Sequence, residues 1–239
     1  MGADFTDNEC LLTDRERKNM KRLARQWKPA LILLLFGGML ICNPAVAESD
    51  FAYRPELCLT GPIVDDVLWT ASLEPKITSD AQQANEISLV GGFYWKPMDY
   101  LAVIPQFKYV TKGVDDSSNE LRPRLAMELT GKAGVCKIAI RNRFEYRMKE
   151  DQDEYWRYRG RIKIKLPKVG TITPFLYDEV FYEFGDKDEL NGNEIGFGGG
   201  LPLGDQLSLC LDIRFCHSRS EGKWGTGDIN FLTVLKYSF

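Results

Sequence analysis

The stretch WRYRGRIKIKL, residues 156–166, separates its side chains into two faces along its whole length. Aromatic, aliphatic and glycine residues occupy the even-numbered positions, and arginine or lysine occupies every odd-numbered position from Arg157 to Lys165. Successive side chains of a β-strand point to opposite faces of the sheet. The alternation therefore predicts a strand with one apolar face and one cationic face.

Similar alternation continues on both sides of this stretch. Ten segments can be drawn: 67–77, 86–96, 100–111, 120–130, 136–148, 155–167, 171–184, 193–203, 206–217 and 229–239. Segments of about ten residues with alternating polarity, in an even number, are typical of bacterial outer-membrane barrels. We predict an all-β fold, a transmembrane antiparallel up-and-down β-barrel of about ten strands.

The connections between these segments alternate in length. Short connections are expected around 97–99, 131–135, 168–170 and 204–205, and longer or more polar ones around 79–85, 112–119, 149–154, 185–192 and 218–228. A barrel with both chain ends in the periplasm has short periplasmic turns and longer outer loops. A soluble β-sandwich, the alternative architecture, has no reason to alternate in this way.

The N-terminal segment has the order of a secretory signal peptide. A basic cluster from Lys21 to Lys28 precedes an apolar run and then Ala45-Val46-Ala47, a small-x-small cleavage motif. We predict a signal peptide over 1–47, with translation starting at Met20, against the alternative of an uncleaved anchor. The barrel domain is expected over 67–239. Residues 48–66 are interpreted as a periplasmic lead-in, an inserted plug or an extra strand.

Composition limits the class of protein. The chain has 239 residues, with 31 Lys and Arg against 34 Asp and Glu and 12% aromatic residues. This balance excludes a disordered acidic chain and gives no basic excess for nucleic acid. Four cysteines follow the predicted signal peptide, at 58, 136, 210 and 216, and allow three disulfide connectivities or none.

If the apolar faces meet lipid, the opposite faces line the lumen. The expected lumen charges are Arg122, Arg124, Arg141, Arg143, Arg147, Arg157, Arg159, Arg161, Lys163, Lys165, Glu128, Glu145, Glu179, Glu183 and Asp212. Like charges at this density need counter-ions, so the first interpretation is a salt-bridged lumen with a structural or binding role. The alternative is a narrow porin for anionic solutes such as acidic oligosaccharides, since rings of Arg and Lys select anions.

An outer-membrane hydrolase is a third, weaker hypothesis. The chain has one histidine, His217, which shares its face with the apolar residues Ile213 and Phe215 and so is expected to point outward. No nucleophile, base and oxyanion set accompanies it. We therefore predict no catalytic residues, no metal site, no cofactor and no enzyme activity.

The C-terminal strand carries a local signal. Phe239, Tyr237 and Leu235 share one face and end the chain with an aromatic residue. This ending looks like the terminal strand that outer-membrane barrels present to the barrel-assembly machinery. With the acidic outer loops, which divalent cations could bridge to lipopolysaccharide, it predicts the Gram-negative outer membrane as location, and membrane lipid, lipopolysaccharide and the assembly machinery as partners.

Three motifs carry a family resemblance. RFEYR at 143–147, WRYR at 156–159 and PFLYDEVF at 174–181, closed by the aromatic terminal strand, resemble the outer-membrane barrels catalogued as domain of unknown function 2490. The resemblance covers most of the chain after the signal peptide and implies a barrel of uncharacterised role. It implies no site residues, because none is established for the family.

Overall fold

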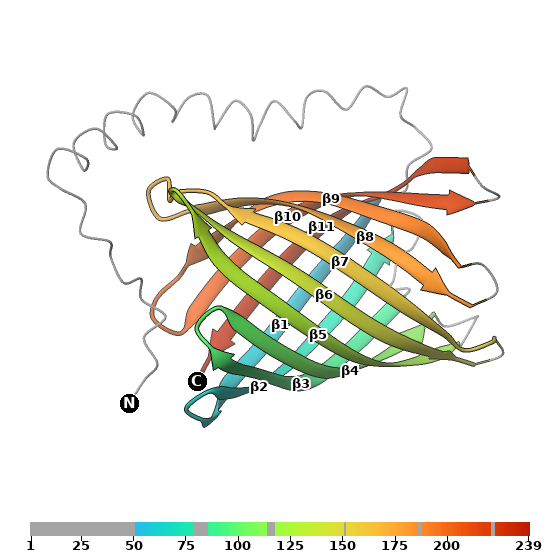
Figure 1. Ribbon diagram of the computed structural model, residues 1–239, viewed down its shortest axis with the longest axis horizontal. Coiled ribbons are helices and arrows are strands. Elements are labelled where there is room, and N and C mark those ends of the chain that lie inside the picture. The colour runs from blue at the N-terminus through green and yellow to red at the C-terminus, as the bar shows by residue number, and fades with distance from the viewer. Residues whose placement is uncertain (1–50, 79–85, 114–117, 151, 186–187, 221–222) are drawn as a thin grey trace, which may run out of the picture. The chain divides into compact units, whose positions relative to one another are not determined.

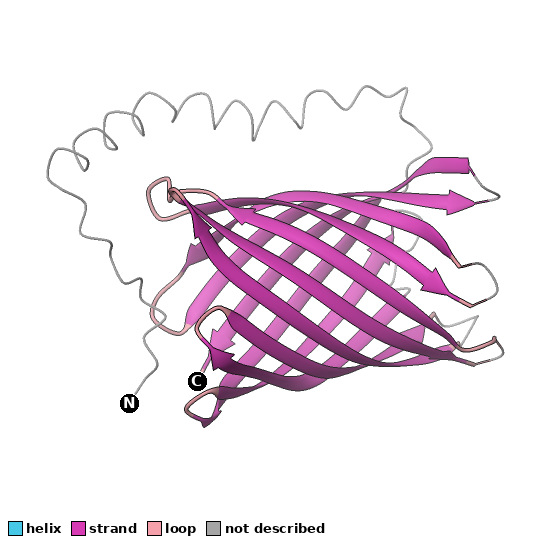
Figure 2. Cartoon of the chain, in the orientation of Figure 1, coloured by secondary structure: helices cyan, strands magenta, loops and turns pink. Residues whose placement is uncertain are grey.

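A computed structural model describes residues 51–78, 86–113, 118–150, 152–185, 188–220 and 223–239 (Figure 1). Every helix or strand assigned in these ranges is a β-strand (Figure 2). The strands are β1 Phe51–Val64, β2 Val67–Thr78, β3 Glu86–Met98, β4 Leu101–Lys112, β5 Asn119–Ala133, β6 Cys136–Lys149, β7 Tyr155–Lys165, β8 Thr173–Phe184, β9 Glu189–Pro202, β10 Leu207–Ser220 and β11 Lys223–Ser238. They form a closed barrel, so the predicted all-β barrel is confirmed.

The barrel closes through one parallel pair of strands. Strands that follow one another in the chain pair antiparallel, whereas β1 pairs parallel with β11 from Phe51↔Ile229 to Thr60↔Ser238. An odd number of hairpin-linked strands leaves the first and last strands running in the same direction. As a result, β1 begins at the end of the barrel that carries the longer loops, and β11 ends among the short turns (Figure 1).

The prediction of ten strands was wrong by one strand. Residues 51–64 form β1 in the barrel wall, so this part of the expected lead-in or plug is the extra strand, the third interpretation of that segment. The predictions of an even number of strands and of a uniformly antiparallel wall were therefore also wrong. The prediction that the barrel's first and last strands begin and end on the same side of the membrane was wrong for the same reason. The predicted signal peptide, 1–47, lies outside the described residues.

The connections alternate only in part as predicted. The connection between β7 and β8, 166–172, was expected to be short but is as long as the one between β2 and β3, 79–85. Short turns join β3 to β4 and β5 to β6, and in the second of these Gly134 adopts a φ of 59°. This left-handed conformation suits glycine, which lacks a Cβ. The expected loop at 218–228 was wrong, because β10 continues to Ser220 and β11 begins at Lys223. The strands remain paired there after a register shift between Phe215 and His217.

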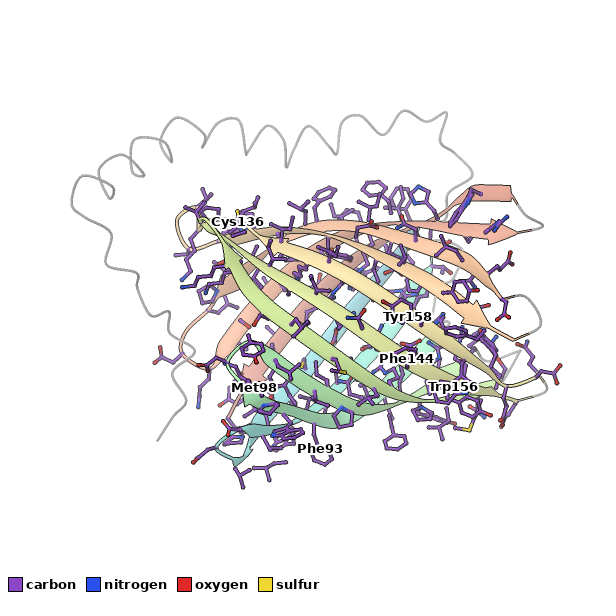
Figure 3. The ribbon with its side chains drawn as sticks, in the orientation of Figure 1. Phe93, Met98, Cys136, Phe144, Trp156 and Tyr158 are labelled. Atoms are coloured by element: carbon purple, nitrogen blue, oxygen red, sulfur yellow. The ribbon has the colours of Figure 1, made fainter. Side chains whose placement is uncertain are left out.

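The outer face of the barrel is apolar. Large hydrophobic side chains along the whole circumference are exposed, including Phe93, Phe144 and Trp156, which Figure 3 labels on the wall. Leu125 on β5 and Leu211 on β10 are 49% and 54% exposed. A water-soluble monomer rarely exposes an apolar surface of this extent. No helix among the described residues is long and apolar enough to cross a membrane.

The inward face is mainly polar and contains the most buried large side chains. Glu145 and Glu179 are 1% and 2% exposed, and Arg143 and Lys108 are 7% exposed. Small residues such as Ser88, which is fully buried, share this face. The centre of the barrel is therefore filled by charged groups that need partners, because an unpaired buried charge is costly.

Glycines on β9 make room for aromatic rings on β8. A Cβ at Gly196 would overlap the ring of Tyr177, its cross-strand partner, and a Cβ at Gly198 would lie 2.7 Å from the Phe175 ring. The Tyr177 hydroxyl donates a hydrogen bond of 3.0 Å over β9 to Asp212 Oδ2 on β10. Gly196 and Gly198 therefore have a packing role, because a side chain at either position would overlap its neighbours.

We expect Gly196→Ala to destabilise the barrel by about 1–3 kcal/mol, the usual effect of overpacking a filled interior. The ring of Tyr177 must move, and its hydrogen bond to Asp212 is then lost. Gly200→Ala is the matched control on the same strand, because no heavy atom lies within 4 Å of its added Cβ. Denaturant unfolding of both variants in detergent measures the difference; equal midpoints would contradict the packing role.

Candidate functional site in the barrel lumen

Two carboxylates organise the arginines of β6 and β7. Glu179 on β8 accepts hydrogen bonds from Arg141 Nη2 at 3.0 Å and from Arg159 Nε and Nη2 at 3.1 and 3.0 Å. Arg143 Nη2 lies 3.7 Å from the same carboxylate. Three cations thus surround one buried anion, an arrangement that removes much of their mutual repulsion.

The second carboxylate is Glu145 on β6. It accepts two hydrogen bonds from Arg157, at 3.0 Å from Nε and 2.6 Å from Nη2, and Arg143 Nε lies 3.0 Å from its other oxygen. Arg159 Nη1 is 3.9 Å away, so Arg159 lies between the two carboxylates. The Arg159 guanidinium carbon also lies 4.3 Å from the centre of the Phe181 ring. We call the residues around Glu145 and Glu179 the arginine network.

A layer of side chains covers the arginine network on the side of the long loops. Glu120 on β5 accepts hydrogen bonds from Arg122 at 2.6 Å and from Arg147 Nη2 at 2.8 Å. Arg147 Nη1 also donates to the Tyr155 hydroxyl at 2.6 Å and lies 3.9 Å from Glu183. Strands β5 to β8 thus hold an ion-paired cluster on one side of this end of the lumen.

A different layer lies on the side of the short turns. The Lys163 ammonium lies 3.6 Å from the centre of the Phe175 ring, and Arg161 pairs with Glu128 at 3.6 Å. Asp212 accepts hydrogen bonds from the Tyr177 hydroxyl and from Arg214 Nε, each at 3.0 Å. Lys165 is exposed at the short-turn end of β7, outside these contacts.

The charged face extends beyond the residues identified from the sequence. Glu74 on β2 accepts a hydrogen bond from Lys108 on β4, and Lys76 pairs with Asp228 on β11 at 3.1 Å. Each of these strands carries only two or three charged residues, so the sequence pattern drew less attention to them. Lys108 is the cross-strand partner of Arg122 and therefore shares its face, a signal that could have identified it.

A cavity of about 370 Å³ lies within this charged interior. Side chains from every strand line it, among them Arg54 on β1, Arg124 on β5 and Glu194 on β9. Nine basic residues, Arg54, Lys76, Lys108, Arg124, Arg141, Arg143, Arg159, Arg161 and Arg214, face five acidic ones, Glu56, Glu74, Glu86, Glu179 and Glu194. Four further carboxylates, Glu128, Glu145, Asp212 and Asp228, pair with basic residues of this wall from outside the lining, so acidic groups at and next to the cavity match the basic ones in number.

His217 lies away from the lumen. It pairs with Asn193 on β9 and Thr226 on β11, on the outward-facing side of β10, as predicted from its position. In the described part of the chain, no group of three or more His, Cys, Asp or Glu side chains is placed to hold a metal ion. Cys58, Cys136, Cys210 and Cys216 are unpaired.

The loop end of the barrel has its own polar contact. Glu150, just beyond β6, accepts hydrogen bonds from the Asn119 backbone N–H at 3.0 Å and from the Asn119 side chain. The backbone hydrogen bond in particular lowers the pKa of Glu150. A lowered pKa means that this contact stabilises the barrel at neutral pH and stops doing so as the pH falls through that pKa.

The C-terminal residues lie on the outward face. The Phe239 backbone N–H donates to the Thr60 carbonyl at 2.9 Å, and its ring centre lies 5.6 Å from that of Trp69 and 4.9 Å from that of Tyr237. Phe239 is 64% exposed and Leu235 is 37% exposed. The terminal aromatic residue is thus held by β1 and β2 and is also accessible from outside.

Comparison with known proteins adds a family and one relative. The model of the family described as a protein of unknown function, DUF2490, matches residues 56–224. An uncharacterized protein of Methylorubrum extorquens is 26% identical over 194 residues, covering 74% of this chain and 84% of the relative. No solved structure matches.

Proposed function

The chain belongs to the DUF2490 family, whose function is unknown, and from that premise we propose that it is an outer-membrane β-barrel protein with a lumen closed by buried ion pairs. Its role in this proposal is structural or ligand-binding, without enzyme activity. Residues 1–47 direct export and are removed. The short turns face the periplasm, and the long loops face lipopolysaccharide.

The apolar outer face carries the proposal of a membrane location. Exposed leucine, phenylalanine and tryptophan side chains surround the wall, while the charged side chains of β5 to β8 are mostly gathered inside. A closed barrel satisfies every interior backbone group without an open edge, as a bilayer requires. The accessible aromatic ending at Phe239 fits recognition by the barrel-assembly machinery, and membrane lipid is the other expected partner.

The ion pairs support a closed lumen rather than an open pore. The arginine network and the Glu120 cluster extend from β5 to β8, and their carboxylates are almost fully buried. A barrel of this size is close to the width that side chains alone fill. The second candidate, a narrow passage for anionic solutes, is favoured by one observation, the nine basic residues that line the cavity.

We expect the protein to fractionate with the outer membrane. We also expect no steady conductance when it is reconstituted in planar bilayers, since buried ion pairs fill much of the lumen. Anion-selective conductance steps that become smaller in Arg159→Glu would favour the porin instead.

Recovery of the processed chain in the soluble periplasmic fraction would contradict the membrane location. A hydrolytic activity lost in His217→Ala would overturn the non-enzymatic role.

A further inference from the structure

Two cationic groups that line the cavity make no direct ion pair within the described barrel. Arg54 and Arg124 line it from β1 and β5, and neither makes an ion pair or a side-chain hydrogen bond with any residue that the structure describes. Both Nε atoms are buried without a hydrogen-bond partner. Arg161, on β7, has one ion pair, and that pair spans 3.6 Å.

No described carboxylate lies within ion-pair distance of either guanidinium, although Glu74 and Glu145 act on Arg124 at longer range. Glu179 and Glu145 are engaged by the arginine network, and Glu74 is engaged by Lys108. An uncompensated cation in a closed interior is costly. Among the basic residues that line the cavity, Arg54 and Arg124 alone lack an ion pair with a described residue. An anion that enters the cavity would remove this cost.

The chemistry of the wall indicates the class of anion. Guanidinium groups on different sides of the cavity match the planar, multi-oxygen geometry of carboxylate and phosphate. Thr70 Oγ1 is buried at the same cavity without a hydrogen-bond partner, and Gln106 and Tyr94 also line it. Glu194 Oε2 likewise lacks a hydrogen bond and can accept one from a hydroxyl group. The wall therefore offers sites for hydroxyl groups as well as for negative charge.

We propose that this cavity binds a small hydroxylated anion, a sugar acid or a sugar phosphate, with Arg54 and Arg124 as the principal anion ligands. Its volume of about 370 Å³ lies at the small end of typical ligand sites, which suits one sugar unit rather than an extended chain. The inference rests on the proposed closed lumen, because an open pore would exchange such a solute without holding it.

Titration calorimetry on the full protein in detergent tests the site with four probes: glucuronate, glucose 6-phosphate, neutral glucose and inorganic phosphate. We expect the two anionic sugars to bind and glucose to be silent at the same concentration. Inorganic phosphate should bind at least tenfold more weakly than glucose 6-phosphate, because it has no sugar hydroxyls. Equal affinity for the two phosphates would overturn the sugar specificity, and silence of all four probes would overturn the site.

Variants show whether binding occurs in the cavity. Arg124→Gln and Arg54→Gln should each weaken anionic-sugar binding at least tenfold, while Arg124→Lys should retain part of it. Lys132→Gln, an exposed cation on the same strand as Arg124, is the matched control and should bind like the parent. Arg124→Gln should also keep or raise the unfolding midpoint of the empty barrel, because it removes an unpaired charge, so weaker binding cannot be attributed to misfolding.

The outcomes separate this inference from the function on which it rests. Membrane fractionation and conductance without added sugar test the barrel and its closed lumen. If those results stand but Arg124→Gln and Arg54→Gln bind like the parent, the cavity assignment alone is wrong. If steady conductance is observed, the closed lumen is wrong whatever the calorimetry shows.

Discussion

Glu179→Gln is expected to destabilise the barrel by about 3–5 kcal/mol, the usual cost of removing one partner from a buried ion pair. The substitution preserves the size of the side chain but removes the charge that Arg141 and Arg159 contact at 3.0 Å. Glu179 is 2% exposed, so water cannot readily replace the lost charge. Denaturant unfolding in detergent micelles measures the loss.

Two comparisons make this result specific. Glu189→Gln is the control, because Glu189 lies near the loop end, with its side chain 28% exposed and a 3.7 Å pair to Arg219, and surface pairs contribute about 0–1 kcal/mol. In the double variant Glu179→Gln with Arg141→Gln, part of the loss should be recovered, because one unpaired cation is removed with its partner. Equal unfolding midpoints for Glu179→Gln and Glu189→Gln would show that the arginine network does not depend on Glu179.

Leu125→Arg should have the largest effect on the outer face, about 2–4 kcal/mol when the barrel is folded into a bilayer, as for a basic residue near the membrane midplane. Leu125 lies near the middle of β5, pairs with Phe144, and is 49% exposed. The cost arises from moving a cation into hydrocarbon, so it should appear in lipid vesicles. Reversible urea unfolding from vesicles measures it.

Val135→Arg provides the depth control for this prediction. Val135 is 73% exposed and lies in the short turn after β5, so a basic residue there should cost only about 0–1 kcal/mol. A large difference between the unfolding free energies lost at these two positions is expected only if the apolar wall is embedded in lipid. Equal, small costs at both positions would contradict the membrane proposal.

Much of the fold could be predicted from the sequence because a period of two is a local property. In β7, neighbouring residues point to opposite faces of the strand. The cationic face from Arg157 to Lys165 could therefore be predicted without knowledge of the rest of the chain. The same pattern placed His217 outward.

The first strand shows where local reasoning failed. Residues 51–64 alternate weakly and contain Pro55, Gly61 and Pro62, residues that weaken or interrupt strands. The pattern therefore allowed a lead-in, a plug or a strand. The structure selects the strand through partners far away in the chain, with Cys58 opposite Lys236 on one side and Ser72 on the other.

The amino-acid order by itself determined that this chain forms consecutive strands with an apolar and a charged face, because alternation depends only on adjacent residues. The tertiary structure alone decided how many strands close the ring and which charges meet. Glu179 reaches Arg141 across 38 positions. Arg54 and Arg124 make no direct ion pair with a described residue, although carboxylates are near them in the sequence. Such outcomes depend on register and curvature around the whole barrel, which no single segment encodes.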